Sequence, residues 1–299
     1  QDLCAWAERS NDGSLSDLSF IPPEGGWERV CSETESCLRL PCPSYRHCFY
    51  YRTRRAAMCS EVVIINHHLL CADISLRHVL GDFSEHLLLP PYKALIVDEA
   101  HHLEDAATSY FSRRFSRFSV RRILDRIYQH KRKKKATGFI TLLARYQKSH
   151  PELERPIDEI QDTMAQARET SDRAFEEFAE FFSIFLDKKE AYGGFIKLNG
   201  DVLYQDEYKD LVFDNLMSLR SLLESLGNSL QAIASILDKH RGAGTRRMKE
   251  HHADLRSLLA KLSDQIALIT TLIVEEQENN IRWIEAKQTK KGREIFFRV

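Results

Sequence analysis

The stretch Ala94-Leu95-Ile96-Val97-Asp98-Glu99-Ala100-His101 decides the fold prediction for this chain. An apolar run that ends on two carboxylates is typical of a buried strand in a parallel sheet, whose carboxyl edge carries ligand sites. The pair predicts NTP hydrolysis, with Asp98 holding the Mg²⁺ of Mg-ATP and Glu99 deprotonating the attacking water. His101 would link the nucleotide state to the rest of the molecule. A helix N-terminus that favours acidic residues is an equally good explanation of the pair.

A second β-branched run, Val62-Val63-Ile64-Ile65, ends on Asn66-His67-His68. It predicts another strand of the same sheet. The three polar residues could be ligands, switch residues or caps, and the sequence assigns no role to Asn66, His67 or His68. Together, the two runs predict an α/β fold.

Beyond residue 113 the apolar spacing becomes helical. Two long amphipathic helices separated by Arg241-Gly242-Ala243-Gly244 predict an antiparallel hairpin inside a large all-α insertion. The alternative is an adaptor that offers its Leu/Ile faces to a partner helix. Residues 281–284 and 294–299 return to strand-like alternation. The helical positions are Phe175, Phe178, Phe182, Phe185, then Leu216, Leu219, Leu223, Leu226, Leu230, Ile233, Leu237, and finally Leu255, Leu258, Leu262, Ile266, Ile269, Ile273.

All seven cysteines lie within the first 71 residues. An odd number without a secretion signal favours metal ligation in a reducing cytoplasm over disulfides. The spacing Cys37-x4-Cys42-x5-Cys48 brings three thiolates close together, and Cys31 could complete a local zinc site. We expect Cys59 and Cys71, which flank the first predicted strand, to be core residues.

The charges are balanced overall, with 43 Lys plus Arg and 44 Asp plus Glu, but their distribution is uneven. From Arg113 to Lys135 there are eleven basic residues and one acid, Asp125, with aromatic residues interleaved. Such a surface suits phosphates and unpaired bases, although a solvated helix face is the simpler interpretation. No apolar run approaches the roughly 20 residues that span a membrane.

The order of these motifs resembles the DinG branch of the XPD-like superfamily 2 helicases. The resemblance rests on Cys37-x4-Cys42-Pro43-x4-Cys48-Phe49-Tyr50-Tyr51-Arg52-x-Arg54, on Asn66-His67-His68-Leu69-Leu70-x-x-Asp73, on Leu89-Pro90-Pro91-Tyr92 and on Asp98-Glu99-Ala100-His101. It covers residues 27 to 110, and it implies a monomeric, ATP-driven 5′-to-3′ DNA helicase of repair or replication that acts on single-stranded or forked DNA.

The resemblance also implies a division of the chain. Residues 1–58 would belong to a [4Fe–4S] domain, 59–112 to a RecA-like motor domain, 113–278 to a helical Arch domain, and 279–299 again to the motor. Cys37, Cys42 and Cys48 would be cluster ligands, with the fourth ligand before Gln1. We expect Tyr50, Tyr51, Arg52 and Arg54 to meet DNA.

No G-x-x-x-x-G-K-[ST] loop occurs in the sequence. Because this loop and its lysine position the ATP phosphates, we expect the chain alone to be inactive. The alternative function is a zinc-binding, nucleic-acid interaction module without ATPase activity, in which Cys31 is a ligand.

Overall fold

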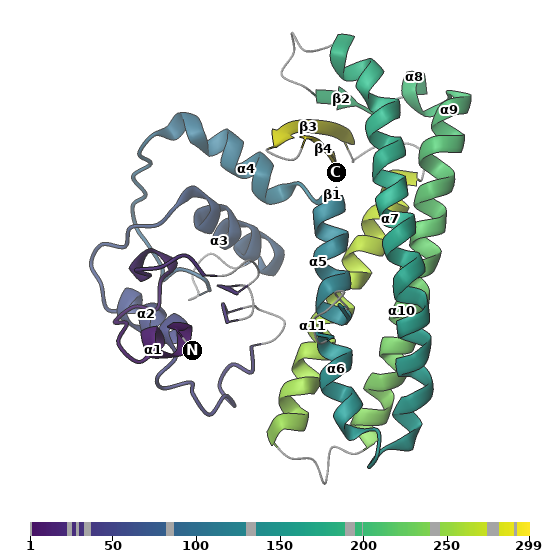
Figure 1. Ribbon diagram of the computed structural model, residues 1–299. Coiled ribbons are helices and arrows are strands. Elements are labelled where there is room, and N and C mark those ends of the chain that lie inside the picture. The colour runs from purple at the N-terminus through teal and green to yellow at the C-terminus, as the bar shows by residue number, and fades with distance from the viewer. Residues whose placement is uncertain are drawn as a thin grey trace. The chain divides into compact units, whose positions relative to one another are not determined.

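A computed structural model describes residues 2–299 apart from 23–25, 28–29, 33–36, 82–86, 130–135, 189–194, 199, 240–245, 274–280 and 290–291. The chain divides into two compact units, Gln1–Ser112 and Arg113–Val299. Figure 1 shows the elements of both. Most of the regular structure is helical, and the sheet that is present is small and antiparallel.

The first unit consists of short helices joined by irregular segments. A short helix lies near the start of the chain, and a longer one forms over residues 49–58. One helix is capped at both ends: Asn66 Oδ1 accepts a hydrogen bond from the Leu69 amide at 2.8 Å, and Gly81 closes the helix at φ 67°. The elements are α1 (Asp2–Ala7), η1 (Leu15–Asp17), α2 (Phe49–Met58), α3 (His67–Leu80), η3 (Ala100–His102) and α4 (Leu103–Phe111).

The two runs expected to be parallel strands do not form strands in the structure. Residues 62–66 and 94–97 have no ladder partner among the described residues. Their apolar side chains are correspondingly exposed, with Ile64 and Ile96 each 94% accessible. A strand is stable only when a neighbouring strand pairs with its amides and carbonyls, so the β-branched composition alone did not suffice. The RecA-like sheet therefore stays a prediction.

The two cysteines expected in the core differ. Cys71 is buried on α3, as predicted, but Cys59 is exposed, so that part of the prediction is wrong. Cys59 is the C-cap of α2, and its amide donates to the carbonyls of Ala56 and Ala57. A helix end at this point places the residue on the surface.

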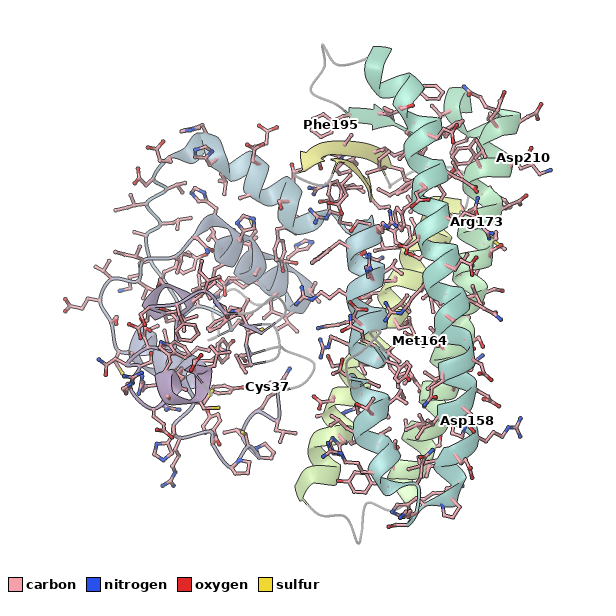
Figure 2. The ribbon with its side chains drawn as sticks, viewed as in Figure 1. Cys37, Asp158, Met164, Arg173, Phe195 and Asp210 are labelled. Atoms are coloured by element: carbon pink, nitrogen blue, oxygen red, sulfur yellow. The ribbon has the colours of Figure 1, made fainter. Side chains whose placement is uncertain are left out.

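The second unit is built around long helices that run side by side in Figure 1, with α7 and α11 both packed against α10, and α5 against α7. Figure 2 labels Asp158, Met164 and Arg173 along α7. The helices are α5 (Arg117–Ile127), α6 (Phe139–Leu143), η4 (Ala144–Tyr146), η5 (Pro151–Leu153), α7 (Glu154–Lys188), α8 (Gly200–Leu203), α9 (Asp206–Tyr208), η7 (Lys209–Phe213), α10 (Asp214–Lys239) and α11 (Arg246–Ile273).

The periodic leucines fill the core of this unit. Every apolar position expected on the face of α10, from Leu216 to Leu237, is at most 4% exposed. They pack within this chain, so the intramolecular interpretation is confirmed over the partner-helix alternative. The glycine turn at 241–244 and the basic run at 131–135 lie outside the described residues.

A four-stranded antiparallel sheet of order β1-β4-β3-β2 completes the second unit. It confirms the strand-like pattern expected at the end of the sequence. The core ring of Phe297 lies 5.3 Å from that of Phe178 and 5.8 Å from that of Phe182, which ties the sheet to α7. The strands are β1 (Arg114–Ser116), β2 (Phe195–Lys197), β3 (Trp283–Thr289) and β4 (Gly292–Arg298).

Residues 281–299 thus lie in the same compact unit as the helices. Their assignment to a motor domain stays a prediction. Among the described residues, none of the helices combines the length and the apolar character required to cross a bilayer.

Candidate functional site

The two carboxylates of the Asp-Glu-Ala-His segment lie on an exposed turn between the extended residues 94–97 and η3. Asp98 Oδ1 accepts a hydrogen bond from the Glu99 amide at 3.0 Å. Glu99 Oε2 lies 3.3 Å from His101 Nδ1, and both side chains are about two-thirds accessible. The three residues that the sequence predicted to carry the chemistry are therefore adjacent and open to solvent.

Glu99 has an unusual backbone conformation. Its φ of 47° and ψ of 49° lie in the left-handed region, where a side chain costs roughly 1–2 kcal/mol. This conformation turns the chain sharply, and the His102 amide then donates to the Glu99 carbonyl at 2.9 Å. Strained residues of this kind cluster at functional sites, so the conformation marks Glu99 as a candidate.

Helix α3 anchors the end of this segment nearest the carboxylates. His67 Nε2 lies 3.1 Å from the carbonyl oxygen of Asp98, 31 residues along the chain. Asn66 is the N-cap of the same helix, and His68 is exposed. The roles that the sequence left open are thus resolved for two residues: Asn66 caps α3, and His67 holds the Asp98 backbone.

A buried ion pair anchors the other end. Arg77 Nε lies 2.6 Å from Asp73 Oδ2, with side-chain exposures of 2% and 0%. Asp73 Oδ1 accepts from the Leu89 amide at 2.9 Å, and an Arg77 guanidinium N–H donates to the Leu89 carbonyl at 3.1 Å. The guanidinium also lies over the ring of Tyr92. The segment from Leu89 to Asp98 is therefore fixed to one helix at both ends.

Asp73 belongs to the motif series that carries the resemblance, but the sequence assigns it no role and does not single out Arg77. The signal available was an acidic and a basic residue four positions apart on an otherwise apolar stretch of helix. Nothing in the sequence identified Leu89 as their common partner.

The donor chemistry of the turn fits Mg²⁺. This ion is usually held by one or two carboxylates together with substrate phosphates and waters. Asp98 and Glu99 supply two accessible carboxylates, whereas the described residues contain no cluster of three or more His, Cys, Asp or Glu that could enclose a metal. The turn therefore suits a cation that arrives with a phosphate ligand.

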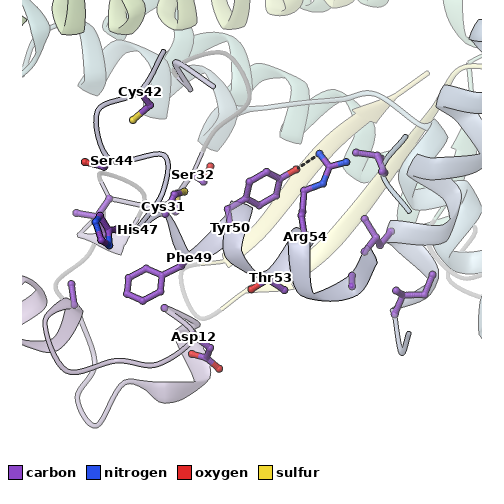
Figure 3. A pocket seen from close by; sticks show the side chains of 18 of the residues that line it. Asp12, Cys31, Ser32, Cys42, Ser44, His47, Phe49, Tyr50, Thr53 and Arg54 are labelled. Atoms are coloured by element: carbon purple, nitrogen blue, oxygen red, sulfur yellow. Dashed lines mark hydrogen bonds between the residues drawn. The ribbon is translucent and has the colours of Figure 1, made fainter. Parts of the chain in front are cut away.

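The three closely spaced cysteines are not brought together. Cys42 and Cys48 line a cavity of about 820 Å³ that Cys31 also lines, whereas Cys37 does not. Figure 3 shows Cys31 and Cys42 at this cavity with His47 and Phe49. The Cys37 sulfur instead lies 3.9 Å from the Tyr51 hydroxyl. The described thiols, as arranged, do not fit a cluster ligand set.

The cavity is mainly apolar. Among its lining residues are Trp6, Trp27, Val63 and Ile64, contributed by three separate stretches of the first unit. Gly13 lies near it with φ 68°, where an added Cβ would overlap the ring of Phe49. The backbone at Gly13 thus lies so close to Phe49 of α2 that no side chain fits between them.

The four residues expected to meet DNA differ in how exposed their side chains are. Tyr50 and Arg52 on α2 are exposed. Arg54 is half-buried, donating to the Leu87 carbonyl and, at 3.4 Å, to the Tyr50 hydroxyl, as drawn in Figure 3. Tyr51 is half-buried, with its ring 4.4 Å from that of Tyr45. Tyr50 and Arg52 are therefore the two that a ligand reaches most directly.

Partial burial raises the pKa of Tyr51, and its hydrogen bond to the Cys37 sulfur raises it further. A phenol with the ordinary pKa of about 10 is already neutral at physiological pH, and the upward shift keeps it so. Its hydroxyl can then donate to the sulfur, which favours a structural contact for this tyrosine.

Comparison with known proteins finds relatives that are named DinG or YoaA. No family model matches the chain. It is 36% identical over 124 residues to the ATP-dependent DNA helicase YoaA of Escherichia coli, which is 41% of this chain and 18% of that protein. It is 27% identical over 244 residues to the 3'-5' exonuclease DinG of Bacillus subtilis, covering 80% of this chain and 24% of that protein.

A third relative is the ATP-dependent helicase DinG of Mycobacterium tuberculosis. It is 36% identical over 110 residues, which is 36% of this chain and 15% of that protein. The chain spans less than a quarter of the length of each of these three relatives. Together with the order of the motifs, these matches identify the chain as a DinG-like sequence, homologous to the DinG and YoaA proteins.

Proposed function

We propose that this chain is part of an ATP-dependent DNA helicase of the DinG type, to which it contributes the hydrolytic carboxylates and a helical domain. The observation that carries the proposal is the exposed Asp98–Glu99 turn, fixed to α3 through His67 at one end and through Asp73 and Arg77 at the other. Two of the three relatives above are named as ATP-dependent helicases.

The residues have separate roles in this proposal. Asp98 would hold Mg²⁺, which neutralises charge on the ATP phosphates when it is bound. Glu99 accepts the proton of the attacking water through a carboxylate oxygen, and its Oε2 lies 3.3 Å from His101 Nδ1. His101 lies in η3, which leads directly into α4. A change in the charge of Glu99 would alter its contact with His101 and thereby the position of these two helices.

Three finer statements belong to the same proposal. The helicase moves 5′-to-3′, its phosphate-binding loop lies outside this sequence, and Cys37, Cys42 and Cys48 hold a [4Fe–4S] cluster with a fourth ligand elsewhere. The last statement requires a rearrangement around Cys37, because the described residues contain no group of three or more thiols that could hold a metal. Metal sites often form only when the ion binds, which makes such a rearrangement reasonable.

The test of the hydrolytic role is Glu99→Gln in a complete helicase that contains this sequence. We expect ATP turnover to be lost while nucleotide binding is retained, because the amide keeps the shape of the side chain but cannot accept a proton. Glu104→Gln is the matched control, since Glu104 is an exposed acid in the first turn of α4. Near wild-type turnover by Glu99→Gln would show that Glu99 is not the base.

One observation favours the zinc alternative: Cys31 lines the same cavity as Cys42 and Cys48. Metal analysis and an anaerobic absorption spectrum separate the two possibilities. Iron and sulfide with a broad band near ~400 nm support the cluster, whereas zinc in a colourless protein supports a local site that includes Cys31.

A further inference from the structure

The peptide group that joins Asp98 to Glu99 is hydrogen-bonded at both of its polar atoms. Its N–H, which is the amide of Glu99, donates to Asp98 Oδ1 at 3.0 Å. Its carbonyl oxygen, which is that of Asp98, lies 3.1 Å from His67 Nε2. A carbonyl oxygen can only accept, so His67 Nε2 is the donor. The plane of this one peptide group is therefore restrained by two hydrogen bonds.

The two hydrogen bonds differ in what they restrain. The first is local, because its donor and its acceptor belong to neighbouring residues. The second comes from α3, in which His67 is the first residue after the N-cap Asn66. The helix is itself fixed in the first unit by buried side chains, which are those of Leu70, Cys71, Asp73 and Arg77. His67 thus ties the peptide group to a packed part of the fold.

The orientation of this peptide group affects both carboxylates. Because the group is planar, its carbonyl and its N–H can turn only together. The Asp98 carboxylate is bonded to the N–H, so it follows the plane. The φ angle of Glu99 is a rotation about the bond that joins this nitrogen to its Cα, so the plane also sets the direction of the Glu99 side chain. A donor that holds the carbonyl therefore orients both acids.

Glu99 needs such a restraint because its backbone conformation is unfavourable. A side chain disfavours the left-handed region, in which Glu99 has φ 47°, by a factor of about 5 to 30. One net hydrogen bond changes an equilibrium by a factor of about 2 to 12. The two factors are of similar size, so loss of the His67 bond releases a large share of the molecules from the left-handed conformation. Strained residues persist where their surroundings fix them, and His67 supplies this restraint.

We propose that His67 is a positioning residue for ATP hydrolysis, which orients Asp98 and Glu99 through the peptide group between them. The inference rests on the proposed function, in which Asp98 holds Mg²⁺ and Glu99 accepts the proton of the attacking water. His67 acts through the backbone, because its Nε2 is bonded to the Asp98 carbonyl. Turnover is sensitive to small displacements of catalytic groups. Loss of this bond should therefore lower kcat.

Four variants separate the hydrogen bond from other effects. His67→Met and His67→Phe remove the donor, and phenylalanine keeps a ring. His67→Gln retains a donor, because its amide nitrogen is the same number of bonds from Cα as histidine Nε2. The control is His68→Met, since His68 is the next residue of α3 and is exposed. His67 is not among the buried residues of the helix, so the fold should be retained in each variant.

The first measurement is nuclear magnetic resonance of the complete 299-residue chain, with Glu99 observed by selective labelling. The carbon chemical shifts and the amide-to-Hα coupling of Glu99 report its φ angle. We expect a left-handed value in the parent chain, in His67→Gln and in His68→Met. In His67→Met and His67→Phe these signals should move toward the values of negative φ. This measurement needs no nucleotide, so it is independent of the catalytic role of Glu99.

The second measurement is steady-state ATP hydrolysis by a complete helicase that contains this sequence. His67→Met and His67→Phe should lower kcat about 5- to 10-fold, within the range that one lost hydrogen bond gives. The KM for ATP should stay within about 2-fold of the parent value, because an interaction that serves the transition state acts on kcat. His67→Gln should restore most of the turnover, and His68→Met should turn over like the parent.

Three results would overturn the proposal. They are a left-handed Glu99 in both donor-free variants, turnover of these variants equal to that of His68→Met, and turnover of His67→Gln as low as that of His67→Met. Failure of the proposed function gives a different result. Turnover that survives Glu99→Gln would contradict the role of Glu99 as the base, whereas the resonance measurement would still decide whether His67 fixes its conformation.

Discussion

Arg77→Met should destabilise the first unit strongly, because it leaves the carboxylate of Asp73 buried without a counter-charge. Both side chains are almost completely buried, at 2% and 0% exposure. Methionine retains much of the length of arginine, so the change removes mainly the charge and the hydrogen bonds. The Leu89 carbonyl loses a donor at the same time.

The magnitude follows from the burial of the pair. Removing one partner of a buried ion pair costs about 3–5 kcal/mol. In Asp73→Asn/Arg77→Met no charge remains unpaired, and the asparagine oxygen can still accept from the Leu89 amide. The principal remaining defect is the Leu89 carbonyl, at about 1–3 kcal/mol. We therefore expect the double variant to be more stable than Arg77→Met by about 2 kcal/mol.

The assay is urea unfolding followed by tryptophan fluorescence in a Trp283→Phe background. The remaining tryptophans, Trp6 and Trp27, lie in the first unit with their rings 5.8 Å apart, so the signal reports on that unit. With a urea dependence of about 1–3 kcal/mol/M, Arg77→Met should lower the midpoint by 1 M or more. Far-ultraviolet circular dichroism, dominated by the long helices, should change little.

Arg46→Met is the control, because Arg46 is an exposed arginine of the same unit. Its midpoint should remain close to that of the parent. The reasoning is refuted if Arg77→Met behaves like this control, or if Asp73→Asn lowers the stability of the Arg77→Met variant further instead of restoring part of it.

Three further outcomes are expected. Burial raises the pKa of Tyr208 to about 12, so its phenol stays protonated in the folded state after the unfolded chain has ionised near pH 10. Stability of the second unit should therefore fall as the pH rises from about 10 to 12, by roughly 2–3 kcal/mol in total, and pH-dependent unfolding of Tyr208→Phe should lack this component. In a complete helicase, Cys42→Ser should abolish the cluster absorption and strand separation while Cys31→Ser changes little; equal bleaching by both would favour the local site. Leu226→Ala, at a fully buried position of α10, should cost about 2–5 kcal/mol in thermal or urea unfolding, and a cost near zero would mean that the helix faces do not form the core.

Several features could be predicted from the sequence because they depend on neighbours along the chain. The apolar spacing from Leu216 to Leu237 predicted α10, since residues three and four apart necessarily share a face. The order of the cysteine, Asn-His-His and Asp-Glu-Ala-His motifs indicated the relationship to DinG-like proteins, because motif order is a property of the sequence itself.

Other features were decided by contacts between distant residues. The runs at 62–65 and 94–97 have strand-like composition, but a strand requires a paired neighbour, and composition does not supply one. β1 pairs with β4, about 180 residues later, which no local pattern indicated. Only the tertiary structure brings Leu89 to Asp73 and Arg77, and only it distinguishes the exposed Arg121 from the paired Arg117. Burial and pairing depend on which surfaces meet in space, and the order of residues along a chain does not fix that by itself.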